Sequence, residues 1–150
     1  RSPFELPGRR MNTSRGWEIF PRIIYDMAMR IKNDYRNIDW FVAESGMGVE
    51  NEAQFRNRDG IIDDAYRIAF ISEHLYYTLL AREAGANCHG YMLWAFTDNV
   101  SPMNAFKNRY GLIEIDLENH RARRAKKSAS WFRQLRDERV LTLRVDDEWK

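Results

Sequence analysis

The hydrophobic and polar positions of the chain predict helices that alternate with strands. Continuous apolar runs within 39–44 and 90–97 are too short for helices and are typical of strands covered on both faces. Apolar residues recur at helical spacing before each run, which predicts one helix over 21–35 and a second from about 64 to 84. Strands that follow helices in this way indicate parallel pairing in an α/β fold.

The ends of these elements carry their own signals. Asp63 or Asp64 is a candidate N-cap of the second helix, and Gly85 follows its end. The other expected segments are loops at 1–15, 46–59 and 98–109, a hairpin over 111–124, a helix opened by Ser128 with Trp131, Phe132 and Leu135 facing inward, and a tail at 140–150 that is a short strand or an ordered terminus.

Two parallel strands do not form a complete sheet, because the chain cannot cover both of its faces and the strand edges stay unpaired. The chain also begins at Arg1, without a methionine. We therefore expect one piece of a larger domain, with no separate second domain within 1–150. The bare sheet predicts self-association or pairing with a missing N-terminal part.

Composition narrows the class of protein. Hydrophobic residues make up 44% of the 150 residues, and 24 basic residues against 22 acidic ones leave a net charge of +2. This balance gives no reason to expect nucleic acid or a membrane as a partner. The basic run Arg121–Lys127 is expected to be a solvated turn and helix start. No apolar run has the length of a membrane span and no signal-peptide pattern is present. A single cysteine suits a reducing compartment, so we expect a cytoplasmic location.

Cysteine and histidine usage argues against metal or disulfide chemistry. The single cysteine, Cys88, cannot form an internal disulfide and is expected to be a buried structural thiol. His74, His89 and His120 lack metal-ligand spacing, with His74 expected on a helix surface or in packing. We expect neither a metal nor another cofactor.

One acid has a position that suits catalysis. Glu44 directly follows the apolar run of the first strand, and a parallel strand that ends in an acid places it at the carboxyl edge of the sheet. A solvated residue at a strand end is the alternative interpretation. The second strand, in HGYMLWAFTDN at 89–99, has the same design one βα unit later.

Four motifs resemble glycoside hydrolase family 1, the retaining β-glycosidases built on a (β/α)8 barrel. FVAESG at 41–46 resembles the nucleophile motif after strand seven, and GYMLWAFTDN at 90–99 resembles strand eight. GWEI with a following proline at 16–21 and RYGL at 109–112 resemble two flanking motifs. The resemblance implies the C-terminal part of a TIM barrel, its last two βα units plus a β-hairpin, with Glu44 as nucleophile and Trp94 as the platform under the sugar.

The loop after the second strand resembles that of the 6-phospho-β-glycosidases, which hold the sugar phosphate with Ser, Lys and Tyr. Ser101 and Tyr110 match this pattern. The usual lysine position holds Asn108, and Lys107 comes one residue earlier, so either residue is a candidate phosphate contact. Pro102 stands where galactoside-selective members have Trp, which favours a phosphorylated β-glucoside as the substrate.

The resemblance also implies a second carboxyl that this chain lacks. The family's acid/base glutamate lies in an N-E-P motif, which does not occur here. Glu18, Glu50, Glu52 and Glu114 have no matching context. The sequence therefore predicts the nucleophile half of a 6-phospho-β-glucosidase, inactive by itself. The alternatives are a 6-phospho-β-galactosidase, a plain β-glucosidase, or a non-catalytic truncated fragment.

Overall fold

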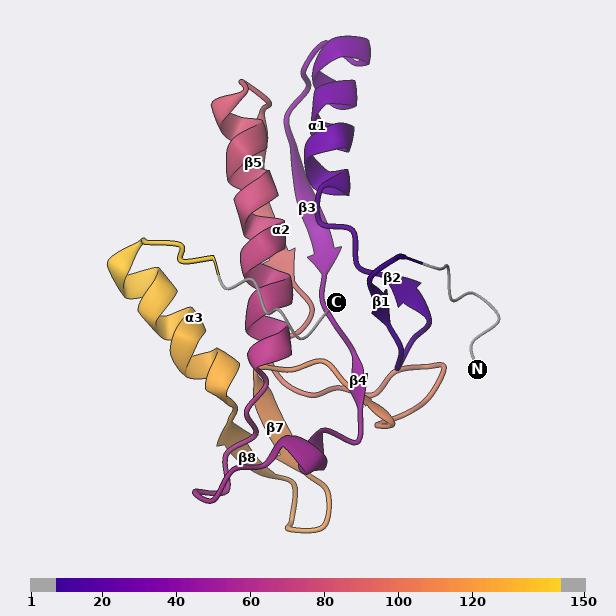
Figure 1. Cartoon of the computed structure of the whole chain (residues 1–150), viewed down its shortest axis with the longest axis vertical. Coiled ribbons are helices and arrows are strands. Elements are labelled where there is room, and N and C mark those ends of the chain that lie inside the picture. The colour runs from indigo at the N-terminus through magenta and orange to yellow at the C-terminus, as the bar shows by residue number, and fades with distance from the viewer. Residues whose placement is uncertain (1–7, 144–150) are drawn as a thin grey trace.

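The computed structural model describes residues 8–143 (Figure 1). Its elements in chain order are β1 (Met11–Asn12), β2 (Trp17–Glu18), α1 (Ile23–Asp34), β3 (Trp40–Ser45), β4 (Val49–Glu50), the 3₁₀ helix η1 (Glu52–Phe55), α2 (Ala65–Glu83), β5 (Cys88–Leu93), β6 (Asn108–Arg109), β7 (Ile113–Asp116), β8 (Ala122–Ala125) and α3 (Lys127–Glu138). The predicted order of helix, strand, helix, strand, hairpin and helix is confirmed.

The predicted parallel pair is formed by β3 and β5. Trp40 lies beside Cys88 and Ser45 beside Leu93, so the two strands end at the same edge. The second strand was predicted at 90–97 and in fact occupies 88–93. It ends early because residues 95–98 leave β3 and hydrogen-bond to residues 110–113 before the β7–β8 hairpin.

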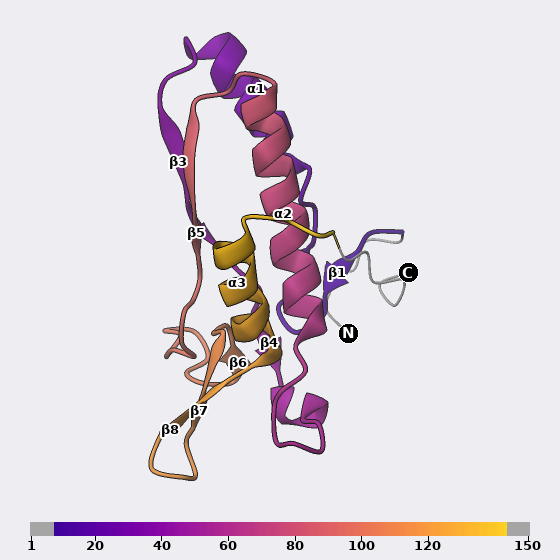
Figure 2. The same cartoon turned by 90° about the vertical axis from the view of Figure 1, so that its left-hand side faces the viewer.

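Both long helices cover the same face of this pair. Figures 1 and 2 show α1 and α2 on one side of β3 and β5. Ala28, Ala81 and Ala86 form the core between them, with Trp40 packed against it. On the other face the side chain of Phe41 is 55% exposed and that of Met92 is 51% exposed. Within residues 8–143 β3 is therefore covered on one face only, because no element reaches the second face. The apolar run alone predicted cover on both faces, whereas the two-stranded sheet predicted incomplete cover.

Short strands lie within segments that were predicted to be loops or, for β2, just after one. β1 pairs with β2 inside the N-terminal region, and β4 pairs with β6 across the loops 46–59 and 98–109. Each has two residues, too few for any alternation of side chains to show in the sequence. The β7–β8 hairpin, by contrast, is confirmed. Residues 1–7 of the predicted N-terminal loop lie outside the described residues.

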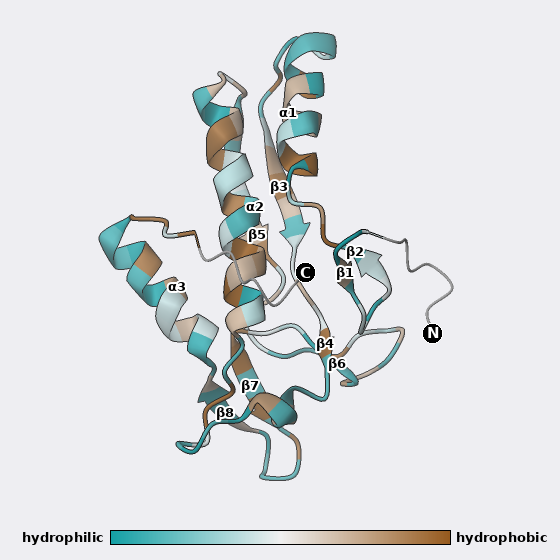
Figure 3. Ribbon diagram, viewed as in Figure 1, coloured by the Kyte–Doolittle hydropathy of each residue, from teal (hydrophilic) through white to brown (hydrophobic). Residues whose placement is uncertain are grey.

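The helix ends follow the sequence signals closely. Asp64 is the N-cap residue of α2, and Gly85 after its end has a left-handed φ of 85° that favours glycine. α3 begins at Lys127, one residue before the predicted start. Phe132 is exposed, contrary to prediction, because α3 contacts the rest of the structure mainly through α2 and β8. Figure 3 shows α3 as largely hydrophilic.

Two remaining predictions concern Cys88 and the C-terminal tail. Cys88 is buried and free, as expected. Residues 141–143 form no strand, and 144–150 lie outside the described residues. None of the described helices is both long and apolar enough to cross a bilayer.

His74 is a buried packing residue of α2. Its ring lies 3.9 Å from the ring of Phe70, measured between centroids, and its Nδ1 lies 2.6 Å from the Phe70 carbonyl oxygen. Burial lowers the pKa of His74, and this outweighs the opposing effect of the carbonyl. The folded state therefore favours the neutral ring.

We expect the free energy of unfolding to fall as pH drops below about 6.5, because the unfolded chain gains a proton there before the folded chain does. This contribution is fully present above pH 6.5 and is lost as pH falls through the lowered pKa. Chemical denaturation at pH 7.5 and 5.5 measures it. His74→Gln should reduce the difference between the two pH values, whereas His120→Gln, at an exposed position, should leave it unchanged.

Candidate active site

Glu44 lies at the carboxyl edge of the β3–β5 pair, as the sequence predicts. It is the penultimate residue of β3 and is exposed. Trp94 immediately follows β5, and its N–H donates to the Ser45 carbonyl oxygen at 2.8 Å. The peptide bond from Trp94 to Ala95 is cis. The two ends of the parallel strands thus place an open carboxylate and a half-exposed indole on adjacent segments.

Gly46 keeps this edge compact. A Cβ at position 46 would lie 1.7 Å from the Trp94 carbonyl oxygen, well inside contact distance. The chain therefore needs glycine two residues after Glu44, where the backbone crosses against the end of β5.

The β4–β6 pair brings the loop after Glu44 against residues 107–110. Glu50 lies opposite Asn108 in this antiparallel pair. Lys107 projects outward, with 66% of its side chain exposed, and its Nζ lies 3.2 Å from Glu50 Oε1. Asn108 is fully buried. Of the two candidate phosphate contacts, Lys107 therefore points to solvent beside Glu50, and Asn108 points inward.

Tyr110 is buried against Gly48. A Cβ at position 48 would lie 2.4 Å from Tyr110 Cζ and 2.8 Å from its hydroxyl oxygen. The absence of a side chain at position 48 therefore sets where the Tyr110 ring and hydroxyl lie.

Replacing Gly48 with alanine should displace the Tyr110 ring and destabilise the fold by about 1–3 kcal/mol, the usual range for overpacking. Thermal denaturation measures the loss. Gly90→Ala is the matched control, because its Cβ would meet nothing closer than the flexible Met92 Cε at 3.3 Å. Equal stability of the two variants would contradict the tight Tyr110–Gly48 contact.

Ser101 and Asn108 belong to one folded loop. The Ser101 N–H donates to the Ala105 carbonyl oxygen at 2.9 Å, and the Ser101 hydroxyl accepts from the Met103 N–H at 3.3 Å. The Asn104 side chain, from the same turn, donates to Asn108 Oδ1. The loop thereby connects Ser101 to the buried Asn108.

A buried ionic network beneath this site escaped the sequence analysis. Arg67 of α2 pairs with Glu52 and, at 2.5 Å, with Asp64. Lys126 pairs with Glu52 and, at 2.9 Å, with Asp98. All five side chains are almost completely buried. The prediction that the basic run 121–127 is solvated is therefore wrong for Lys126, which enters the core between β8 and α3.

The network fixes both loops of the candidate site. Arg67 Nη2 donates to the Met47 carbonyl oxygen at 3.3 Å and to the Arg109 carbonyl oxygen at 2.9 Å. Met47 lies three residues after Glu44, and Arg109 directly precedes Tyr110. One guanidinium therefore links the loop that follows the strand-end acid with the segment that contains Tyr110.

Glu52 is held ionised in this network. Burial alone would raise its pKa, but the charges of Arg67 and Lys126 outweigh burial and hold the pKa of Glu52 below its ordinary value. Tyr66 donates to Glu52 Oε1 at 2.5 Å, and burial raises the pKa of this phenol above its usual range. A carboxyl that must donate a proton needs a raised pKa, so Glu52 is unsuited to act as a general acid.

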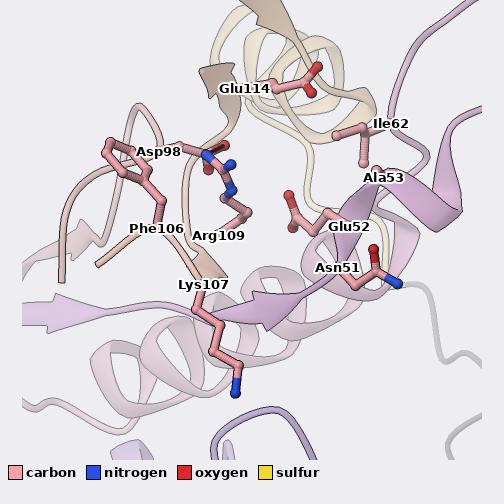
Figure 4. Close-up of a pocket in the computed structure, with 9 residues that line it drawn as sticks. All are labelled: Asn51, Glu52, Ala53, Ile62, Asp98, Phe106, Lys107, Arg109 and Glu114. Carbon is pink, nitrogen blue, oxygen red and sulfur yellow. Dashed lines mark ion pairs between the residues drawn. The ribbon is translucent and has the colours of Figure 1, made fainter. Parts of the chain in front are cut away.

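A charged cavity of about 250 Å³ opens beside the network (Figure 4). Arg109 stacks on Phe106, with 5.1 Å from its Cζ to the ring centroid, and Figure 4 shows its guanidinium directed towards Asp98. Glu114 on the far wall pairs with Arg56 at 2.5 Å. Lys107 points away from these groups in Figure 4. Within residues 8–143 no three His, Cys, Asp or Glu side chains gather as metal ligands would.

Comparisons with known proteins agree with the architecture. The chain is 49% identical over 133 residues to the 6-phospho-β-glucosidase GmuD of Bacillus subtilis, covering 89% of this chain and 29% of that protein. It is 39% identical over 130 residues to a 6-phospho-β-galactosidase of Clostridium acetobutylicum, covering 86% of this chain and 26% of the relative. The chain thus spans less than a third of the length of these relatives.

A solved structure shows the same fold. The β-glucosidase from Thermotoga maritima, in complex with a methyl acetic acid-substituted glucoimidazole, superposes with a TM-score of 0.80 over 92% of this chain and 30% of that one, at 24% identity. This β-glucosidase has a TIM-barrel fold, so the predicted fold class is confirmed. Residues 8–143 form an α/β portion of such a barrel and do not close it. The model of glycosyl hydrolase family 1 matches residues 7–140. The chain therefore belongs to glycosyl hydrolase family 1.

Proposed function

We propose that this chain supplies the nucleophile and the sugar-phosphate contacts of a retaining 6-phospho-β-glucosidase. The observation that carries the proposal is the exposed carboxylate of Glu44 at the carboxyl end of β3, beside Trp94 at the end of β5. Barrel enzymes place their catalytic groups at this edge. Trp94 is 41% exposed and can offer a ring face to a sugar.

The reaction proceeds through two displacements. The Glu44 carboxylate attacks the anomeric carbon, the bond to the leaving oxygen breaks, and a glycosyl ester forms on Glu44. A second carboxyl about 5–5.5 Å away protonates the leaving oxygen and then deprotonates the water that cleaves the ester. This second group comes from outside the chain, and the 150 residues alone do not turn over substrate.

The ion pairs of three other glutamates support the proposal that the acid/base carboxyl comes from outside this chain. Glu50 pairs with Lys107, Glu114 pairs with Arg56, and Glu52 is buried between two cations. For Glu52 the two cations outweigh burial and hold the pKa below its ordinary value, which favours the ionised form and is the wrong state for the leaving-group acid.

The substrate phosphate is held by Ser101, Tyr110 and the segment Lys107–Asn108. A hydroxyl can donate to a dianionic phosphate, whereas a carboxylate at the Ser101 position would repel it. The names of the two relatives, a 6-phospho-β-glucosidase and a 6-phospho-β-galactosidase, support a phosphorylated substrate. Pro102 favours the gluco configuration.

A chimera tests the proposal with this chain's own residues. The chain replaces the matching 133-residue segment of GmuD, and turnover is measured on chromogenic 6-phospho-β-glucoside, 6-phospho-β-galactoside and unphosphorylated β-glucoside. We expect the chimera to hydrolyse the 6-phospho-β-glucoside fastest, and we expect the 150-residue chain alone to hydrolyse none of the three substrates. Faster hydrolysis of the unphosphorylated β-glucoside would contradict the proposed phosphate site. Turnover by the 150-residue chain alone would show that the acid/base carboxyl lies within this chain.

The bare face of β3 and β5 is the proposed surface for pairing with the rest of the barrel. Phe41 and Met92 are exposed on it, and in the described structure each strand has a single neighbour. Unpaired strand edges with apolar side chains promote association. Sedimentation of the chain alone should therefore show self-association, and a monodisperse monomer would contradict this role.

A further inference from the structure

Asn108 stands where related enzymes have a phosphate-binding lysine, and the side chain of Arg15 contacts Asn108. Arg15 lies in the turn between β1 and β2, 93 residues before Asn108 in the sequence. Its Nη1 is 3.5 Å from Asn108 Oδ1. The sequence offered no signal for this contact, because the turn was predicted to be part of a plain loop.

The turn that carries Arg15 is anchored on β4. Asn12 Nδ2 donates to the Gly48 carbonyl oxygen at 3.0 Å, and the Glu50 N–H donates to the Ser14 hydroxyl at 3.0 Å. Gly48 is also the residue against which Tyr110 packs. The segment from Gly48 to Glu50 therefore contacts both the turn that carries Arg15 and the ring of Tyr110.

Two N–H donors remain unused where these side chains meet. Arg15 Nε and Asn108 Nδ2 are both buried and have no hydrogen-bond partner among residues 8–143. Asn104, whose Nδ2 donates to Asn108 Oδ1, also has an unused acceptor, its Oδ1. Buried donors are normally satisfied, and the two unused N–H groups therefore leave room for an acceptor from a ligand. A phosphate dianion carries several acceptor oxygens and no obligatory donor, which suits both groups.

The charge around Arg15 also differs from that around Lys107. In the described part of the chain Arg15 has no ion pair with a carboxylate, and its Cζ lies 4.4 Å from the centroid of the Trp17 ring. Lys107 is exposed and already paired with Glu50. A guanidinium stacked on an indole keeps its charge available in a fixed plane and can bind phosphate through two parallel bonds.

We propose that Arg15, together with the amide of Asn108, binds the 6-phosphate of the substrate and supplies the positive charge that a lysine supplies elsewhere in the family. This assignment rests on the proposed function, since it concerns the phosphate of the same substrate. It makes the β1–β2 turn a part of the specificity site.

Binding of glucose 6-phosphate and of glucose to the 150-residue chain tests the assignment. Isothermal titration gives both affinities, and the ¹⁵N-resolved resonance of the Arg15 Nε–H reports contact directly. Loss of one charge-assisted hydrogen-bonding group corresponds to about a tenfold or greater loss of affinity. Arg15→Met should lower the affinity for glucose 6-phosphate by that factor without changing the affinity for glucose, and Arg15→Lys should restore part of it.

Arg9→Met is the matched control, because Arg9 lies near the same hairpin in an exposed pair with Glu18. It should leave both affinities within about twofold. Circular dichroism confirms that each variant retains the fold. A greater loss with Lys107→Met than with Arg15→Met, an equal loss for glucose and glucose 6-phosphate, or no glucose 6-phosphate binding by the unmodified chain would each overturn the assignment. Failure of the glycosidase assay with phosphate binding intact would instead count against the proposed function.

Discussion

Replacing Glu44 with glutamine in the GmuD chimera should lower kcat by about 10⁴-fold or more, a loss typical of removing a nucleophile from a covalent mechanism. Glutamine has nearly the same shape as glutamate and can occupy the same place at the end of β3. Its amide cannot form the glycosyl ester, so the first displacement stops. Hydrolysis of a chromogenic 6-phospho-β-glucoside measures the loss, and the affinity for glucose 6-phosphate should change little.

A matched control separates chemistry from general damage. Glu138 lies at the end of α3, is exposed, and accepts a hydrogen bond from Gln134 at 2.9 Å. Glu138→Gln should retain kcat within about twofold, since surface changes of this kind are nearly neutral. In Glu44→Ala, azide should enter the freed space and restore turnover by forming a glycosyl azide of inverted configuration. Nearly full activity of Glu44→Gln would remove Glu44 from the mechanism.

Replacing Arg67 with methionine should lower the free energy of unfolding by about 3–5 kcal/mol, the usual effect of removing one partner from a buried ion pair. Arg67 is 1% exposed and neutralises Glu52 and Asp64 while donating to the carbonyl oxygens of Met47 and Arg109. Methionine fills most of the space but leaves two buried carboxylates short of a cation. Chemical denaturation at pH 7.5 measures the change.

Arg22→Met is the control for this prediction. Arg22 pairs with Asp26 at 3.3 Å, one helical turn along α1, with most of its side chain in water. Exposed pairs of this type contribute less than about 1 kcal/mol. Similar losses in the two variants would show that the buried network does not hold the loops together.

The long elements and the position of Glu44 could be predicted because their signals are local. The apolar run of β3 ends beside an acid, α2 has helical spacing over five turns, and Gly85 marks its end. These patterns depend on neighbours within a few residues. They also fix the parallel order of β3 and β5, which brings Glu44 and Trp94 to the same edge.

The ionic network could not be predicted because its partners are distant in sequence. Lys126 lies in a basic run that reads as solvated, yet its Nζ meets Glu52, 74 residues earlier, and Asp98, 28 residues earlier. Whether a lysine enters a core depends on paired acids that arrive from other elements. The contact of Arg15 with Asn108 was hidden for the same reason.

Coverage of β3 was mispredicted for a different physical reason. Its apolar residues are suited to burial on both faces, but residues 8–143 provide helices for one face and leave Phe41 exposed on the other. The apolar residues of β3 suit a strand that is buried on both faces in a larger domain. The two-strand pattern already predicts a larger domain, and the motif resemblance indicates which fold that domain has.

Covalent labelling of the chimera tests the central claim most directly. A 2-deoxy-2-fluoro-6-phospho-β-glucoside with a good leaving group forms the glycosyl ester but hydrolyses slowly, because fluorine disfavours the positively charged transition state. Peptide mass spectrometry then locates the modified side chain. The proposed mechanism predicts one sugar phosphate attached to Glu44, in the peptide that contains Ala43 and Ser45. An ester on another carboxylate, with Glu44 unmodified, would contradict it.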